Sequence, residues 1–349
     1  MTFVVLESIK TQYYSLTPGD ATPVAPLVKI NGLATDPSHD TIMLTDVYLT
    51  RLTEWQYILA HFQSHIEIVP AADLLDPGVP ADELSAQGFL QMSDSKIAAE
   101  VAALRALGWH LRPRATGALI TAVAAPSPAR RAHLRVADRI VAVDGTTVTT
   151  GCAMVAAVHD VAPGTLVRLS VERAHINVQG DISWSSPSAI VVTAARPPDA
   201  GTTSCPGVHG ANRAWLGVAL DDGVGFSLPG TISINTAYIG GPSAGLAMAL
   251  TLVDQLSAGS LTGHVIIAAT GTVAPNGAVG EIGGVAEKAV AVHDAGATLF
   301  LVPQGSDVRL ARAAAGPGLR VIGVTTLAQA LRDLRGLGGD APVPLTRPR

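Results

Sequence analysis

A serine on a glycine-rich turn is the clearest candidate nucleophile in this sequence. Ser243 stands in the run Gly240-Gly241-Pro242-Ser243-Ala244-Gly245, between the β-forming segment 231–239 and the apolar segment 246–256. We expect these segments to be a strand and a helix. Such a turn presents the hydroxyl on a rigid bend, and backbone N–H groups between Gly241 and Ala244 could stabilise an oxyanion. A capped helix start can have the same residues, so the motif indicates catalysis only together with a base.

Lysine is rare in this sequence, and one lysine is placed where a general base would be. Only four of the 23 basic residues are lysines, namely Lys10, Lys29, Lys96 and Lys288. The spacing predicts a helix over residues 281–296 that Gly296 ends. Lys288 falls on the small, apolar side of this helix, whereas Glu287 and Asp294 fall on another face.

Burial among apolar side chains would allow this lysine to act as a base. Loss of hydration lowers the pKa of an amine, and a base that works near neutrality needs a shift of about 3 units, or about 4 kcal/mol. Arginine could not replace it, because a guanidinium does not deprotonate in proteins. We therefore expect Lys288 to be buried close to Ser243.

Motifs on both sides of this pair resemble a known family. The residues that carry the resemblance are Gly241 to Gly245, Ala269-Thr270-Gly271-Thr272, Gly280 to Gly284, Glu287-Lys288, Ala295-Gly296 and Phe300 to Pro303. In this order they resemble the proteolytic domain of Lon proteases. The resemblance implies a Ser–Lys dyad in which Ser243 is the nucleophile and Lys288 the general base. It also implies that the Thr270 hydroxyl forms a hydrogen bond with the lysine.

The middle of the chain is similar to a second family. Strands are predicted at 118–123, 139–143 and 166–171, and a short helix at 153–158. This pattern resembles a PDZ domain of the type found with bacterial proteases, although Ala137 stands where a glycine is usual. The resemblance implies peptide binding, with a carboxylate-binding loop formed by Gly117, Ala118, Leu119 and Ile120.

Together these features predict a multidomain α+β protein. We expect an N-terminal mixed α/β segment (1–112), a PDZ-like β-domain (113–198), a Lon-type proteolytic α+β domain (203–336) and a tail (337–349), with a linker at 196–201. In the N-terminal segment, turns are predicted at 17–20 and 36–38, and a helix begins near Ser93 and stops at Gly108. Nearly the whole chain resembles bacterial PDZ-containing Lon-like proteases.

Composition and motifs narrow the classes of partner. Of the 349 residues 48% are hydrophobic, which excludes a wholly disordered chain, and the net charge of −5 without a basic cluster disfavours nucleic acid. No Gly-x-x-x-x-Gly-Lys-Ser/Thr run occurs, so we expect no bound nucleotide and no cofactor. The histidines are scattered, and we expect no metal site. Cys152 and Cys205 could form one disulfide in an oxidising compartment.

The family resemblance also implies a location and partners. Its members typically have an N-terminal membrane anchor, with the rest of the chain outside the cytoplasm. Residues 1–6 could be a remnant of such an anchor or a first β-strand. We therefore predict the extracytoplasmic face of the cell membrane, with the anchor absent or truncated here. Protein or peptide substrates and a homo-oligomer, a hexamer by resemblance, are the expected partners.

Three other interpretations compete with an ATP-independent serine endopeptidase. Gly-x-Ser-x-Gly also occurs in α/β-hydrolase esterases, which would need an acid and a histidine from among Asp254, Asp294, His264 and His293. Ser93-Asp94-Ser95-Lys96 matches the Ser-x-x-Lys motif of penicillin-binding proteins, but we expect Ser93 to cap a helix and Lys96 to face solvent. A PDZ peptide-binding protein with a degenerate protease domain is the third interpretation.

Overall fold

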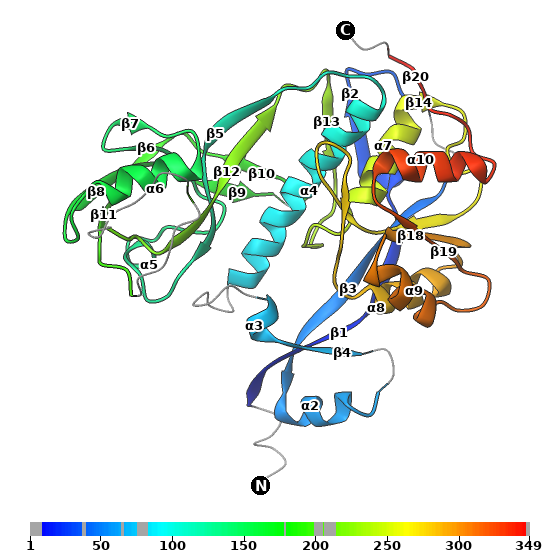
Figure 1. Ribbon diagram of the computed structural model, residues 1–349, viewed down its shortest axis with the longest axis horizontal. Helices are drawn as coiled ribbons and strands as arrows, with labels where there is room; N and C mark the ends of the chain where they lie inside the picture. The colour runs from blue at the N-terminus through cyan, green and yellow to red at the C-terminus, as the bar shows by residue number, and fades with distance from the viewer. Residues whose placement is uncertain are drawn as a thin grey trace. The chain divides into compact units, whose positions relative to one another are not determined.

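The protein folds as a multidomain α+β structure with two compact units (Figure 1). The computed structural model describes residues 9–36, 40–63, 66–74, 83–177, 179–198, 205 and 214–346. The first unit comprises the described residues within 1–74, 91–111 and 228–349, and the second those within 75–90 and 112–227. The predicted bounds 1–112, 113–198 and 203–336 do not coincide with this division, because N-terminal and C-terminal strands share one sheet.

A six-stranded sheet forms the centre of the first unit. Its order is β19 (Arg320–Val324), β18 (Leu299–Pro303), β15 (Ile267–Ala269), β3 (Ile42–Thr53), β1 (Lys10–Pro23) and β4 (Glu67–Pro70). The pairs from β19 to β3 are parallel, whereas β1 pairs antiparallel with both β3 and β4. β15, β18 and β19 are joined by helical crossovers, as parallel strands require.

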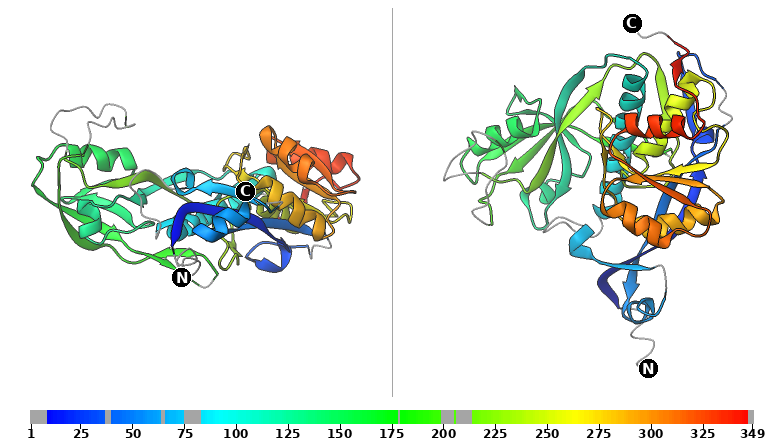
Figure 2. Two further views of the ribbon diagram at one scale, coloured as in Figure 1. Left: turned by 90° about the horizontal axis from the view of Figure 1, so that it is seen from below. Right: turned by 45° about the vertical axis from the view of Figure 1, so that its right-hand side comes forward.

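Four helices cover this sheet. α8 (Val285–Asp294) packs with α9 (Ser306–Ala314), and α7 (Gly245–Leu256) packs with α10 (Leu327–Gly336). Figures 1 and 2 show the two pairs on opposite faces of the sheet. The apolar face of α8 recurs every three or four residues at Val285, Ala289 and Val292, and it packs on Phe300 and Val302 of β18.

Shorter strands and helices complete the first unit. The paired strands are β2 (Val28–Asn31) with β13 (Thr231–Ile234), β14 (Ser257–Ala258) with β20 (Val343–Pro344), and β16 (Thr272–Val273) with β17 (Val279–Gly280). The short helices are η1 (Ala25–Leu27), α2 (Glu54–Ala60) and α3 (Ala71–Leu74). α2 begins with a capping box, in which Thr53 and Gln56 satisfy each other's backbone N–H groups.

The second unit is a sheet with a buried apolar core. Its strand order is β11 (Ser188–Thr193), β8 (Leu166–Glu172), β6 (Arg139–Val143), β5 (Pro113–Val123) and β12 (Val218–Phe226), with β7 (Thr146–Thr147) on β6. The helices α5 (Pro128–Arg131) and α6 (Gly151–His159) and the hairpin of β9 (Ala174–Ile176) and β10 (Ile182–Trp184) accompany it. The three strands and the helix predicted in this region are confirmed.

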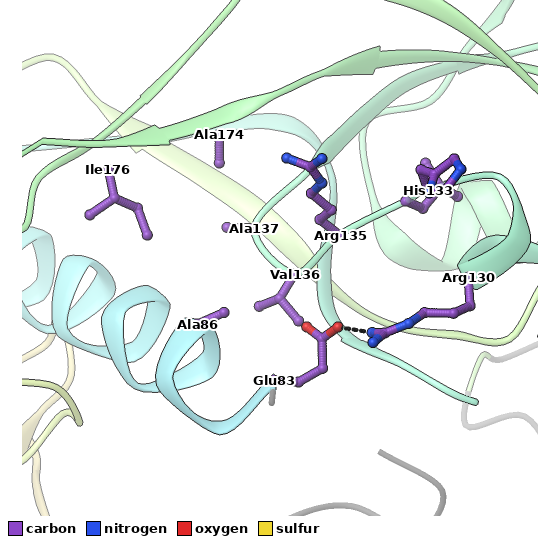
Figure 3. Close-up of a pocket in the computed structure, with 10 residues that line it drawn as sticks. Glu83, Ala86, Arg130, His133, Arg135, Val136, Ala137, Ala174 and Ile176 are labelled. Carbon is purple, nitrogen blue, oxygen red and sulfur yellow. Dashed lines mark hydrogen bonds and ion pairs between the residues drawn. The ribbon is translucent and has the colours of Figure 1, made fainter. Parts of the chain in front are cut away.

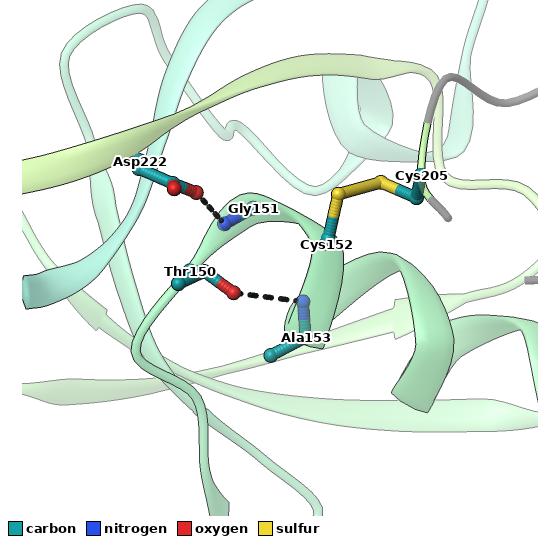
Figure 4. Close-up of a disulfide and its surroundings, with 6 residues drawn as sticks. All are labelled: Thr150, Gly151, Cys152, Ala153, Cys205 and Asp222. Atoms are coloured by element: carbon teal, nitrogen blue, oxygen red, sulfur yellow. Dashed lines mark hydrogen bonds between the residues drawn. A yellow bond between two sulfur atoms is a disulfide. The ribbon is translucent and has the colours of Figure 1, made fainter. Parts of the chain in front are cut away.

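A disulfide joins Cys152, in the first turn of α6, to Cys205, so the pair that the sequence left open is formed (Figure 4). The N-terminus of α6 is held by two further contacts. The Thr150 hydroxyl accepts from the Ala153 N–H at 3.1 Å, and the Asp222 carboxylate of β12 accepts from the Gly151 N–H at 2.8 Å. These bonds fix α6 beside β12.

Several predicted element bounds are corrected. The helix expected near Ser93 is α4 (Leu84–Ala106), which begins nine residues earlier, so Ser93 lies inside a helix and caps nothing. The turn expected at 17–20 is an irregularity within β1, where the register shifts between Pro18 and Ala21. The strand expected over 231–239 ends at Ile234.

The predictions for the N-terminus, for one turn and for the linker concern residues outside the described ranges, in whole or in part. Residues 1–6, most of the turn at 36–38 and the second half of the linker at 196–201 lie outside the described ranges. Within those ranges, no helix combines the length and the hydropathy of a membrane span.

Candidate active site

The Ser243 turn is held by bonds from outside the turn. α7 begins at Gly245 with Ala244 as its N-cap, and no side chain caps it. The Ser243 carbonyl accepts from the Gly271 N–H at 2.8 Å and from the Thr270 hydroxyl at 3.2 Å. The neighbouring carbonyl, that of Pro242, accepts from the Ser95 hydroxyl at 2.9 Å. The backbone on both sides of the Ser243 side chain is therefore fixed.

Lys288 lies against Ser243. Its side chain projects from the apolar face of α8 and is only 2% exposed. The Nζ atom donates to the Ser243 Oγ atom at 2.9 Å. The helix can approach β3 because residue 284 is a glycine with φ of +66°, where a Cβ would lie 3.0 Å from a Val47 methyl group.

Burial dominates the electrostatics of this lysine. Loss of hydration lowers the pKa of Lys288 from 10.5 to about 8, although the charges of Asp46, Asp307 and Glu287 act in the opposite direction. Glu287 was expected on a solvated face but is only 5% exposed, because the α8 face that carries it is also covered. The same burial raises the pKa of Asp46 and of Asp307 above the ordinary carboxyl value.

Backbone donors are available beside the nucleophile. Within the described residues, the N–H groups of Ser243 and Ala244 donate to no protein acceptor. Gly241 has φ of +85°, a left-handed conformation that favours glycine, and it forms the bend before Ser243. The turn therefore has the free N–H groups that stabilisation of an oxyanion needs.

Thr270 is close to the pair but contacts a different atom from the one predicted. Its side chain is completely buried, and its hydroxyl donates to the Ser243 carbonyl. The sequence interpretation assigned this hydroxyl to the lysine. In the structure Thr270 acts on the backbone of the nucleophile instead.

The residues predicted as a carboxylate-binding loop do not form a loop. Gly117, Ala118, Leu119 and Ile120 lie within β5, which pairs with β12 on one edge and with β6 on the other. Their backbone groups are therefore engaged in the sheet, and this prediction is corrected. In the described part of the sheet, β12 pairs only with β5, so its outer edge is open, as is that of β11 at the other end.

The histidines of the competing esterase interpretation each contact an acidic side chain in the structure. His264 is 70% exposed at its side chain and faces Asp40, while His293 contacts its neighbour Asp294. Lys96 was expected in solvent but is 4% exposed, because α4 is covered on the side that carries it. Neither arrangement brings a second base to Ser243.

The second unit contains a cavity of about 450 Å³ that the sequence did not predict (Figure 3). Glu83 and Arg130 form an ion pair at its rim, and Val136, Ala137 and Ile176 contribute apolar walls. It includes no member of the dyad. In the described ranges, no group of three or more histidine, cysteine or acidic side chains could hold a metal ion.

Sequence reasoning missed two residues of the site. Ser95 comes from α4 and Asp46 from β3, both far from Ser243 in the chain. No local pattern marked either of them. The Ser-x-x-Lys match drew attention to Ser93 and Lys96, whereas the intervening Ser95 is the residue that contacts the turn.

Comparisons with known proteins agree with the geometry. Residues 105–183 match the PDZ domain family, and residues 237–333 match the Lon protease C-terminal proteolytic domain. A Lon protease from Clostridioides difficile is 41% identical over 70 residues, which cover 20% of this chain and 9% of the relative. Lon protease 1 from Herpetosiphon aurantiacus is 46% identical over 67 residues, which cover 18% and 8%. The chain thus combines a PDZ domain with the proteolytic domain of Lon proteases.

Proposed function

We propose that this protein is an ATP-independent serine endopeptidase that cleaves protein substrates with Ser243 and Lys288. The observation that carries the proposal is the 2.9 Å contact between the Lys288 Nζ and Ser243 Oγ atoms, made by an amine that is 2% exposed. An amine with a pKa of about 8 is partly neutral near pH 7, so it can accept the hydroxyl proton.

The reaction follows from this geometry. Neutral Lys288 takes the proton as Ser243 Oγ attacks the scissile carbonyl, and the oxyanion accepts from backbone N–H groups at Ser243 and Ala244. The protonated lysine then donates to the leaving amine, and the acyl-enzyme remains. In the second half, Lys288 takes a proton from water, which attacks the ester carbonyl. The protonated lysine then gives this proton to Ser243 Oγ as the ester bond breaks, which releases the acid and restores the Ser243 hydroxyl and the neutral amine.

Peptide capture would take place in the second unit. The open edge of β12 can add an extended peptide as a further strand, because its backbone groups there have no strand partner in the described sheet. α6 lies beside β12 and would form the other wall. This assignment replaces the loop predicted at Gly117 to Ile120.

We also propose that the protein works outside the cytoplasm. The Cys152–Cys205 disulfide supports this location, because structural disulfides persist in oxidising compartments and are rare in the cytosol. Membrane association and a hexameric assembly remain proposals that follow from the family resemblance.

The test uses the full chain with a fluorescently labelled, denatured protein as substrate, without added nucleotide. S243A and K288R should lose activity by about 10³-fold or more, since arginine keeps the charge but cannot accept a proton. K29R is the matched control, because Lys29 is exposed on β2. Retained activity in K288R would refute the lysine base, and absent labelling of wild-type Ser243 by a fluorophosphonate would favour a non-catalytic PDZ protein.

The pH profile gives a second test of the same proposal. With a pKa of about 8, the neutral fraction of Lys288 rises from about 1% at pH 6 to about 90% at pH 9. We expect kcat/KM to rise with it over this range. A flat profile, with the chemical step shown to limit the rate, would contradict the proposal.

A further inference from the structure

The two peptide planes around Ser243 share one feature, which is an anchored carbonyl group. In the first plane, Pro242 to Ser243, the carbonyl accepts from the Ser95 hydroxyl at 2.9 Å. In the second plane, Ser243 to Ala244, the carbonyl accepts from Thr270 and from the Gly271 N–H. Both peptide bonds are trans, since the cis bond among the described residues is at Ala125-Pro126.

A trans peptide links the direction of its carbonyl to that of its N–H group. The group is planar, so the N–H points away from the side to which the C=O points. Fixing the Pro242 carbonyl therefore fixes the Ser243 N–H, and fixing the Ser243 carbonyl fixes the Ala244 N–H. These are the two N–H groups that donate to no protein acceptor in the described structure.

The contact from Ser95 depends on close approach between α4 and the turn. Ser95 is 5% exposed, and a Cβ atom added at Gly245 would lie 3.0 Å from its hydroxyl oxygen. The same Cβ would lie 2.9 Å from the Val273 backbone nitrogen. Gly245 thus leaves the space that lets the serine reach the Pro242 carbonyl.

The weaker local alternative does not replace this contact. The Gly245 N–H also approaches the Pro242 carbonyl, but at 3.4 Å, which is near the limit for such a bond. Among the described residues, Ser95 is the side chain that donates to this carbonyl, at the shorter distance of 2.9 Å. On the other plane, by contrast, two donors share the Ser243 carbonyl.

We infer that Ser95 is a positioning residue that orients the Ser243 N–H as an oxyanion donor. The inference rests on the proposed function, since it concerns the transition state of the same reaction. An oxyanion donor acts on the tetrahedral state and little on the bound substrate. Loss of the Ser95 hydroxyl should therefore lower kcat and leave KM nearly unchanged.

The experiment compares S95A with S93A, two variants of identical composition on one helix. Ser93 is also buried, at 7% exposure, and it lies two residues before Ser95 in α4. We expect kcat of S95A to fall about 10- to 100-fold, as misplacement of a catalytic group does, with KM within about twofold of wild type. Inhibition by a peptide boronic acid, whose serine adduct is tetrahedral, should weaken by a similar factor.

The acid limb of the pH profile supplies a readout of a different kind. It should stay where it is in wild type, because the pKa of Lys288 is set by burial and neighbouring charges that this substitution does not touch. A merely structural loss of packing would instead lower the melting temperature and raise KM. S93A should behave as wild type in all four measurements.

Two outcomes would overturn the inference. The first is a kcat of S95A equal to that of S93A in an enzyme whose wild type is active. If S95A fails to fold, S95T and S95V are compared instead. The two side chains have the same shape, and only threonine keeps the hydroxyl. The second outcome that would overturn the inference is an equal kcat in these two variants. An inactive wild type, or activity retained in S243A, would refute the proposed function itself. These two results can be distinguished from a failure of the Ser95 inference, which requires an active wild type.

Discussion

Replacing Lys288 by methionine should make the protein more stable while abolishing its activity. The folded pKa of about 8 lies below the ordinary 10.5, so between these values the unfolded chain binds more protons than the folded one. Stability therefore rises with pH through this window. Below about pH 8 the full penalty is present, and 2.5 units correspond to about 3 kcal/mol at 1.36 kcal/mol per unit. Methionine is unbranched and apolar, so K288M removes the penalty with little change in shape.

This figure is an upper value for the gain. Asp46 and Asp307 lose a favourable charge in K288M, and burial then favours their protonated forms more strongly. We expect K288M to unfold at a higher temperature than wild type at pH 7. The gap should narrow above pH 8 and vanish above about 10.5, where the lysine is neutral in both states.

The assay is thermal unfolding followed by circular dichroism at several pH values between 7 and 10. K29M is the matched control, because Lys29 is exposed and its replacement should leave stability nearly unchanged at every pH. A K288M protein that melts at a lower temperature than wild type at pH 7 would refute the idea that desolvation lowers the pKa of Lys288 at a cost in stability. So would a gap that does not depend on pH.

Two further predictions concern the neighbours of the dyad and the disulfide. D46N removes a charge that raises the pKa of Lys288, so the acid limb of the kcat/KM profile should move to lower pH; a shift to higher pH would contradict this assignment. Replacing Cys152 and Cys205 by serine opens a loop with a separation of 53 residues and should destabilise the second unit by about 4 kcal/mol. Equal melting of this variant and the oxidised parent would argue against a stabilising disulfide.

The sequence was sufficient where the relevant pattern is local. The helical period places Lys288 on the same side as Val285 and Val292, and that face is buried in the structure. The strand at 139–143 was predicted with its observed bounds, because a turn with positive φ at Asp144 and Gly145 ends it. In both cases neighbouring residues carry the whole signal.

The sequence failed where burial or pairing depends on distant residues. Lys96 follows three polar residues, 93–95, and was predicted in solvent, but it is only 4% exposed in the structure. Gly117 to Ile120 were interpreted as a loop from the resemblance to PDZ domains, whereas β6 and β12 pair with both edges of this segment. The domain bounds failed to coincide for the same reason, since Ile42 of β3 pairs with Ile267 of β15. Contacts between residues far apart in the chain cannot be predicted from the pattern of neighbouring residues.

The acidic residues near Lys288 raise the pKa of its amine and would set its strength as the proposed base. Desolvation alone would lower the pKa of the amine further, which would give more neutral lysine at pH 7 but a weaker base. The charges of Asp46, Asp307 and Glu287 oppose this effect and hold the pKa at about 8. About one tenth of the amine is then neutral at pH 7, and each neutral amine has a higher affinity for the serine proton. If the carboxylates act in this way, D46N should raise the relative rate at low pH and lower the plateau at high pH.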